Sequence, residues 1–149
     1  MLKDMRTVVA ESQKGMSLVE ILIALTLMGI AGTFVAGKIY ERLESGQIDS
    51  AKIQIRNLAS RVKEFRGFCG YYPTTDQGLD ALIEKPTGGR ECNKYPAGGL
   101  IDGGKIPKDP WDFEFVYESD GKSFDIKSLG ADGAEGGEGV DADISFKAL

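Results

Sequence analysis

The chain passes abruptly from a polar to an apolar segment near its start. Residues 1–15 are mainly polar, and from Met16 the sequence reads MSLVEILIALTLMGIAGTFVAGKIY. Between Glu20 and Lys38 stand 17 uncharged residues, most of them apolar. A helix of that length spans about 25 Å at ~1.5 Å per residue, which is the lower limit for crossing a membrane. The pattern predicts a membrane-spanning helix over residues 16–38.

Helical periodicity continues after the apolar segment, but on one face only. Apolar residues follow one another at steps of four, three, four and three, namely Ala51, Ile55, Leu58, Val62 and Phe65. This spacing is typical of an amphipathic helix that buries one side. We predict one long helix from about residue 17 to residue 66, whose part 39–66 packs on a globular head.

The rest of the sequence predicts short elements joined by irregular segments. Thr74 and Gln77 have the spacing of a capping box, in front of a short helix that Pro86 ends. Residues 87–110 are rich in glycine and proline and predict a loop. A strand over 113–117, a Ser-Asp-Gly turn and a second strand over 124–129 predict an antiparallel β-hairpin. The expected fold class is α+β: a long N-terminal helix packed on a small head with a short helix and an antiparallel hairpin or sheet.

Composition excludes several function classes. The 149 residues carry 18 basic and 23 acidic side chains, a formal net charge of −5. This argues against nucleic acid as the main partner, because phosphate binding needs a basic stripe. The absence of histidine excludes Ser–His and Cys–His catalysis and histidine-ligated metals. We expect that the protein is not an enzyme; a calcium-regulated, membrane-anchored enzyme is the disfavoured alternative.

Glu20 is a carboxylate within the apolar run. An unpaired charge there is costly in hydrocarbon, unless it lies at the solvated membrane interface or has a positive partner. Cleavage after Gly15 would give Met16 a free α-amino group one helical turn from Glu20, and this amine on a neighbouring subunit could be the partner. An ordinary secretory signal peptide fits less well, because no A-x-A-like site follows the apolar run.

This N-terminal arrangement resembles the class III signal of type IV pilins and type II secretion pseudopilins. The matching residues are Lys14-Gly15, then MSLVE at 16–20, then the apolar helix. The resemblance implies a prepilin leader over 1–15, cleavage between Gly15 and Met16, N-methylation of Met16 and subunit docking by Glu20. Two features depart from the pattern: Met16 replaces the usual phenylalanine, and the leader is longer than most.

The head is similar to one branch of that superfamily. The segments YPTT at 72–75, QGL at 77–79, KP at 85–86 and PKDPW at 107–111 resemble the major, G-type pseudopilin of type II secretion systems. The sequence departs from that family at Trp111-Asp112, where Trp-Gly is usual, and in carrying two cysteines.

This resemblance implies a function and its partners. The chain would be the major structural subunit of the type II secretion pseudopilus, polymerising in the periplasm to drive export of folded proteins across the outer membrane. It would be a single-pass inner-membrane protein with a periplasmic head over 39–149. Its implied partners are copies of itself, the prepilin peptidase, minor pseudopilins, and the inner-membrane assembly platform with its secretion ATPase. A type IV pilin for adhesion or motility is the alternative.

Residues 130–143 hold five glycines and five acidic residues and no basic one. Such a segment is either a solvated loop or one neutralised by a cation, and hard oxygen ligands on a flexible backbone suit Ca²⁺. Its first half resembles the calcium loop of G-type pseudopilins, although the stretch that follows is longer. The resemblance implies calcium ligands from the carboxylates of Asp132, Asp141 and Asp143 and from the backbone carbonyl of Leu129.

Two cysteines, Cys69 and Cys92, bracket the predicted short helix. They lie too far apart for a CxxC redox or zinc motif. A disulfide between them is permitted if the head lies in the periplasm, and free buried thiols are the alternative.

Overall fold

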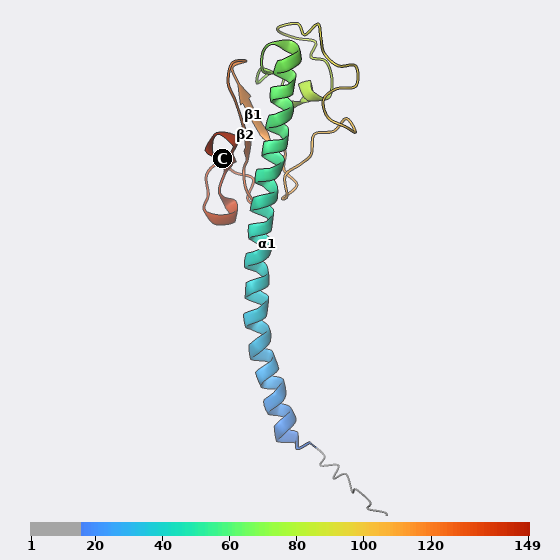
Figure 1. The fold of residues 1–149 in the computed structure, drawn as a ribbon. Helices are drawn as coiled ribbons and strands as arrows, with labels where there is room; N and C mark the ends of the chain where they lie inside the picture. The colour runs from blue at the N-terminus through green and yellow to red at the C-terminus, as the bar shows by residue number, and fades with distance from the viewer. Residues whose placement is uncertain (1–15) are drawn as a thin grey trace, which may run out of the picture. The chain divides into compact units, whose positions relative to one another are not determined.

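The protein is described by a computed structural model over residues 16–149, so the predicted leader and Gly15 lie outside the described residues. The chain divides into two units, one ending at Tyr40 and one spanning Glu41–Leu149, which we call the head. Helix α1 (Leu18–Cys69) runs through this division (Figure 1). The predicted boundary between residues 38 and 39 falls next to it.

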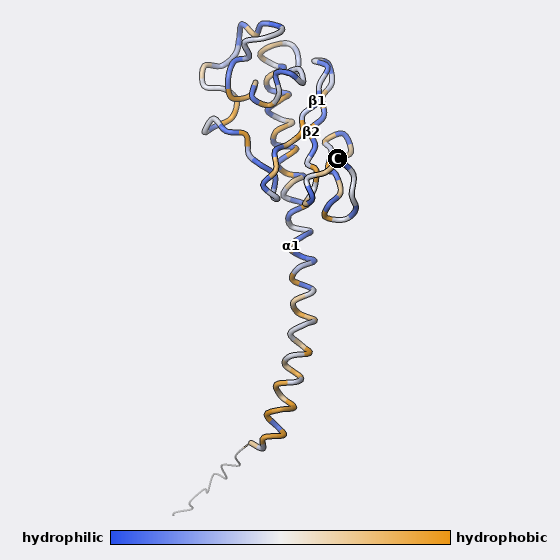
Figure 2. The backbone as a smooth tube through the Cα atoms, turned by 180° about the vertical axis from the view of Figure 1, so that it is seen from behind, coloured by the Kyte–Doolittle hydropathy of each residue, from blue (hydrophilic) through white to orange (hydrophobic). Residues whose placement is uncertain are grey.

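In the first unit, α1 leaves its apolar side chains uncovered. Leu18 is 80% exposed, Met28 72% and Phe34 74%. Figure 2 shows the hydrophobic colour along this part of the helix. The helix is long and apolar enough to cross a membrane by length and composition. An apolar surface of this kind needs lipid or other apolar helices around it.

In the head, α1 buries the stripe that its periodicity predicts. The five predicted residues, Ala51, Ile55, Leu58, Val62 and Phe65, are all 3% exposed or less, and Ala59 joins them. Tyr71, Leu82 and Ile126 belong to the same core. The predicted amphipathic helix and its buried face are therefore confirmed.

Helix α1 ends at Cys69, three residues beyond the predicted end at residue 66. Gly67, the first residue after the predicted end, lies within the helix. Gly70 ends it instead: its φ is 80°, and its N–H donates to the carbonyl of Arg66 at 2.8 Å. A left-handed glycine that returns a hydrogen bond to the last turn is a common helix stop.

The predicted short helix is a single 3₁₀ turn, η1 (Leu79–Leu82). The side chain of Gln77 accepts a hydrogen bond from the N–H of Thr74 at 3.0 Å, which is the returning half of the predicted capping box. Gly78, at φ 60°, turns the chain just before Leu79, so no α-helix starts there. Residues 83–115 form neither helix nor strand, which confirms the predicted loop.

The sheet has three antiparallel strands in the order β1 (Val116–Ser119), β2 (Phe124–Ser128) and β3 (Ile144–Ser145). The hairpin of β1 and β2 is the predicted one. Its turn is held by Asp120, whose carboxylate accepts from the N–H groups of Ser123 at 2.6 Å and Lys122 at 2.8 Å. These hydrogen bonds hold the pKa of Asp120 below its usual value. Two further 3₁₀ turns, η2 (Gly139–Asp141) and η3 (Phe146–Ala148), flank β3, and β3 was not predicted.

A buried carboxylate delays the start of β1. Asp109, 5% exposed, accepts from the N–H groups of Trp111 at 3.1 Å and Phe113 at 2.8 Å and from the hydroxyl of Ser128 at 2.6 Å. Its own N–H donates to the carbonyl of Phe113 at 2.9 Å. These bonds fold residues 109–113 into a turn, so the strand begins at Val116 and not at Phe113.

Tyr117 of β1 ties the sheet to the segment after α1. Its hydroxyl donates to the carbonyl of Pro73 at 2.8 Å. Burial raises the pKa of Tyr117 to about 12. The hydroxyl of Thr75 donates to the carbonyl of Ser119 at 3.0 Å and accepts from the N–H of Ser119 at 2.8 Å.

Asp112 has a φ of 71°, and no other described residue besides glycine has a positive φ. This conformation costs an L residue about 1 kcal/mol or more relative to glycine. Its ion pair with Lys108, 3.4 Å long with Asp112 88% exposed, contributes little. We expect Asp112→Gly to raise the free energy of unfolding by up to about 1 kcal/mol. Urea unfolding of the detergent-solubilised chain, followed by the fluorescence of its single tryptophan, measures this.

The matched control is Glu114→Gly, two residues away and not at positive φ. This change only adds freedom to the unfolded chain, so it should lower stability. If both variants lose stability equally, the backbone at Asp112 is not strained.

Candidate functional site

Met16 and Glu20 lie at the start of α1. Met16, 71% exposed, precedes the helix, and the N–H of Ile21 donates to the carbonyl of Ser17 at 3.1 Å. Glu20 therefore stands in the first helical turn, where the helix dipole favours a negative charge. Within residues 16–149 its carboxylate forms no ion pair. A positive partner for Glu20 is therefore not found among the described residues.

The acidic segment 129–143 is a loop closed by its own backbone. The N–H of Ala131 donates to the carbonyl of Val140 at 3.0 Å, and that of Asp143 to the carbonyl of Gly136 at 3.1 Å. Gly130 and Gly137 both have positive φ, and a Cβ at either would overlap the backbone of Asp141. The glycines that suggest flexibility in the sequence thus allow a close approach of two backbone segments.

The structure does not gather the predicted calcium ligands. Asp132 accepts from the N–H of Ala134 at 3.0 Å, and Asp143 accepts from the N–H of Gly136 at 3.1 Å. Both are exposed, whereas Asp141 and Leu129 are half-buried. Nowhere in the described part of the chain do three acidic side chains come together as a metal site. The oxygen donors suit Ca²⁺ chemically, but in this arrangement Asp132 caps a local turn and Asp143 bonds across the loop.

Phe113 contacts the loop itself, and Ser128 and Lys127 form hydrogen bonds at the end of β2 just before it. Ser128, fully buried, donates to Asp109. The ring of Phe113 lies against Gly133, where a Cβ would overlap it. Lys127, the last basic residue before the loop, donates to Glu118 at 3.1 Å. This hydrogen bond raises the pKa of Lys127, and the nearby charges of Asp125 and Glu135 add to the effect.

Asp125 is a structural residue that the sequence analysis missed. It is 5% exposed and accepts from the hydroxyl of Ser145 at 2.7 Å and from the N–H of Lys147 at 3.1 Å. These bonds hold the segment after the loop on β2. Strand alternation beside the buried Phe124 and Ile126 would place Asp125 in solvent, so no sequence signal marks it.

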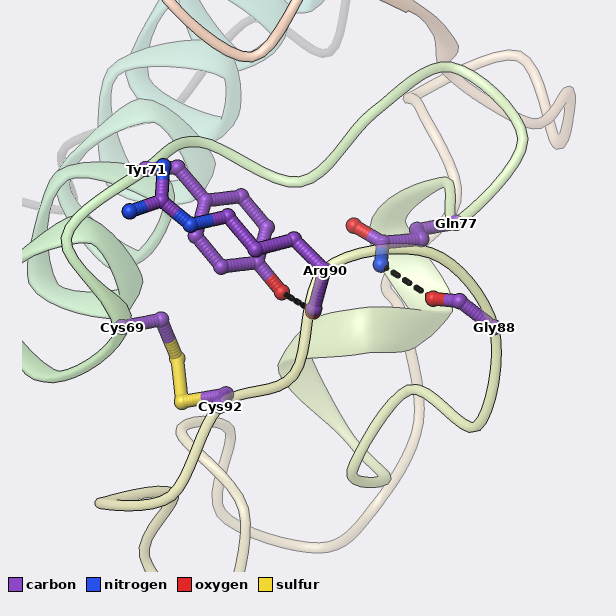
Figure 3. The surroundings of a disulfide bond; sticks show 6 residues. All are labelled: Cys69, Tyr71, Gln77, Gly88, Arg90 and Cys92. Carbon is purple, nitrogen blue, oxygen red and sulfur yellow. Dashed lines mark hydrogen bonds between the residues drawn. A yellow bond between two sulfur atoms is a disulfide. The ribbon is translucent and has the colours of Figure 1, made fainter.

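A disulfide joins Cys69 at the end of α1 to Cys92, with 4.7 Å between the Cα atoms. Figure 3 shows Tyr71 beside it, with its hydroxyl donating to the carbonyl of Arg90. The Arg90 guanidinium lies 5.2 Å from the Tyr71 ring centroid, and Phe65 meets that ring edge-on at 5.6 Å. The disulfide that the sequence permits is therefore formed, and it anchors the irregular segment after η1 to the core.

Removing this bond should destabilise the head. Because the disulfide spans 23 residues, the chain-entropy model gives a loss of roughly 3 kcal/mol for the Cys69→Ser, Cys92→Ser double variant. Urea unfolding of the full chain measures it. Wild-type protein treated with reductant is the matched control and should lose a similar amount. Equal stability with and without reductant would contradict the assignment.

The comparison with known proteins identifies this architecture. Residues 38–147 match the family described as type II secretion system (T2SS), protein G. The chain belongs to this protein G family. The prokaryotic N-terminal methylation motif matches residues 12–36, across the predicted cleavage point.

Relatives and a solved structure agree with the protein G assignment. The type II secretion system core protein G of Vibrio cholerae serotype O1 is 38% identical over 134 residues, covering 89% of this chain and 90% of the relative. That of Pseudomonas aeruginosa is 36% identical, covering 89% and 93%. The crystal structure of the major pseudopilin of enterohaemorrhagic Escherichia coli matches with a TM-score of 0.62 and 30% identity, covering 72% of this chain and 92% of that one.

Protein G membership confirms the predicted family, fold class and function. The chain is a structural subunit of the major pseudopilin type, built as a long N-terminal helix with a small antiparallel head, and the type IV pilin alternative is not favoured. The methylation motif and the apolar helix also imply prepilin peptidase processing and a membrane-anchored pseudopilus subunit. The cleavage point, the role of Glu20 and the calcium ligands stay predictions.

Proposed function

We propose that this chain, cut between Gly15 and Met16, polymerises through its apolar helix into the periplasmic pseudopilus that drives export of folded proteins across the outer membrane. The observation that supports this most strongly is the first unit. Its apolar side chains are uncovered from Leu18 onwards, and Glu20 has no positive partner among the described residues. Both features are unfavourable for an isolated molecule, and both are relieved by side-by-side packing of copies.

The proposed docking step rests on electrostatics in an apolar medium. Removal of residues 1–15 leaves an amine on Met16, and N-methylation keeps its positive charge. In a bundle of apolar helices, a carboxylate without a partner costs several kcal/mol. Pairing Glu20 with the Met16 amine of a neighbouring copy removes that cost and sets the axial position of each incoming helix.

The same proposal fixes location and partners. Before assembly, the subunit is a single-pass protein of the inner membrane with its head in the periplasm. The prepilin peptidase trims and methylates it, the assembly platform and secretion ATPase raise it into the filament, and minor pseudopilins complete the assembly. No catalytic step is assigned to the chain itself.

We expect Glu20→Ala to abolish docking but not processing. Chains isolated from membranes should begin at N-methylated Met16 in wild type and variant alike, as mass spectrometry of the N-terminus reads out. Filaments sheared from cells and sedimented should fall at least about tenfold, because a desolvated amine is left unpaired.

Two controls separate docking from processing. Glu41→Ala removes an exposed acid of the same helix outside the apolar run and should leave filament yield unchanged. Gly15→Val should leave residues 1–15 attached and prevent assembly. Filaments made of uncut chains, or normal yield from Glu20→Ala, would refute the docking step.

We also propose that Ca²⁺ binds the loop at residues 129–143 and stabilises the head. The support is the chemistry of the donors: the carboxylates of Asp132, Asp141 and Asp143 and the carbonyl of Leu129 are the hard oxygens that Ca²⁺ prefers. Asp132 and Asp143 each use one carboxylate oxygen in a hydrogen bond to a loop amide, which leaves the other oxygen of each for the ion. We assign no step of filament growth to the ion.

If the ion binds, Ca²⁺ at about 100 times its dissociation constant should stabilise the head by roughly 2.7 kcal/mol and raise its melting temperature by several degrees. Thermal melts in Ca²⁺ and in chelator measure this. Asp132→Ala should abolish the shift. The matched control is Glu135→Ala, in the same loop but outside the predicted ligands, and it should keep the shift. An equal melting temperature in Ca²⁺ and chelator would refute calcium binding.

A further inference from the structure

Charge is unevenly distributed within the head. Residues 41–69 of α1 carry six basic and four acidic side chains, a net charge of +2. Residues 70–149 carry eight basic and sixteen acidic side chains, a net charge of −8. One face of the helix is therefore basic, while the surface built by the rest of the head is acidic. Two such heads repel in most orientations and attract where the helix of one meets the acidic surface of the other.

The basic part of α1 contains a stripe that we call the basic stripe: Lys52, Arg56 and Lys63. Their spacing of four and seven residues places them on one side of the helix. Lys52 pairs only with Asp49, at 3.7 Å, and that acid is 72% exposed. Arg56 and Lys63 form no ion pair within residues 16–149; Lys63 lies 5.0 Å above the ring of Phe146. The charge of the stripe is largely unneutralised.

A hollow in the acidic surface lies beside η1, and we call it the acidic groove. It has a volume of about 580 Å³. Asp76, Asp80 and Glu84 line it, and across the described chain none of them forms an ion pair. Lys85 is the one basic residue that lines it. The groove therefore holds three negative charges against one positive charge.

The wall of the groove is held in place by Gln77. Its side-chain oxygen accepts from the N–H of Thr74, and its side-chain nitrogen donates to the carbonyl of Gly88 at 2.7 Å. Figure 3 shows this second bond joining the start of η1 to the loop that follows it. The hollow is thus shaped by a polar bridge between two segments.

We propose that the acidic groove of one copy receives the basic stripe of a second copy. The charges are opposite, and neither surface finds partners within its own chain. The groove and the stripe are different surfaces, so every copy offers both, and the contact leads to an open polymer and not to a closed dimer. This inference rests on the proposed function and names the head contact that acts beside the apolar helices.

Charge reversal in the full-length chain tests the contact. Asp80→Lys and Arg56→Glu should each lower the sedimented filament by roughly fivefold or more, because each replaces an attraction by a repulsion. The double variant restores opposite charges and should return the yield to within about twofold of wild type. Raising the salt concentration during filament isolation should weaken the wild-type polymer.

The matched controls reverse exposed charges outside both surfaces. Glu91→Lys and Lys122→Glu change the net charge by the same amounts and should leave the yield unchanged. The melting temperature of every variant should equal that of wild type, which excludes a folding defect.

Three results would overturn the contact. One is wild-type yield from both single reversals. Another is a double variant that stays as poor as the singles at unchanged melting temperature. The third is an effect of Asp80→Lys that appears only with a divalent cation present, because the groove would then hold an ion. If wild type itself forms no filament, the proposed function fails and not this contact alone.

Discussion

The packing of one face of α1 on the sheet and loops is the constraint on which the head depends. Six residues of the helix, from Ala51 to Phe65, are almost completely buried, and the short elements that cover them could not form a core alone. Large-to-small changes in such a stripe cost about 2–5 kcal/mol each, a large fraction of the stability of a small domain. The same helix leaves its earlier part uncovered. The sequence of α1 therefore has one part that packs within the head and another part whose apolar side chains are left uncovered.

Regular patterns made much of this architecture predictable. The apolar run and the steps of three and four along α1 reflect helical geometry directly, and both are found. The hairpin follows from alternation and a turn sequence. What failed were the ends of elements, because single side chains decide them: Gly70 and not Gly67 stops the helix, and the carboxylate of Asp109 turns the chain before β1. The strand β3 has only two residues and depends on Asp125, which no local pattern reveals.

The acidic loop illustrates how composition can mislead about conformation. Its glycines and carboxylates suggest a flexible segment whose side chains are free to bind a metal ion. In the structure two of the glycines allow the backbone of Asp141 to approach, Asp132 caps a local turn, and Asp143 bonds across the loop. Residue identity predicted which chemistry is present, but not how the oxygens are directed, because that depends on contacts across the loop. The N-terminal site differs: Glu20 is placed by helical periodicity alone, so its position in the first turn was predictable.

The bond between Cys69 and Cys92 has a mechanical consequence. In the proposed filament, a subunit under tension would be pulled through its helix and its head contacts. The 23-residue span between the sulfurs would add about 80 Å to the chain if it were drawn out straight. While the disulfide is intact, this segment cannot extend under tension. The tension passes from the end of α1 through the disulfide to the residues after Cys92. The segment between the two cysteines, which holds only one short 3₁₀ turn, is thereby kept from stretching.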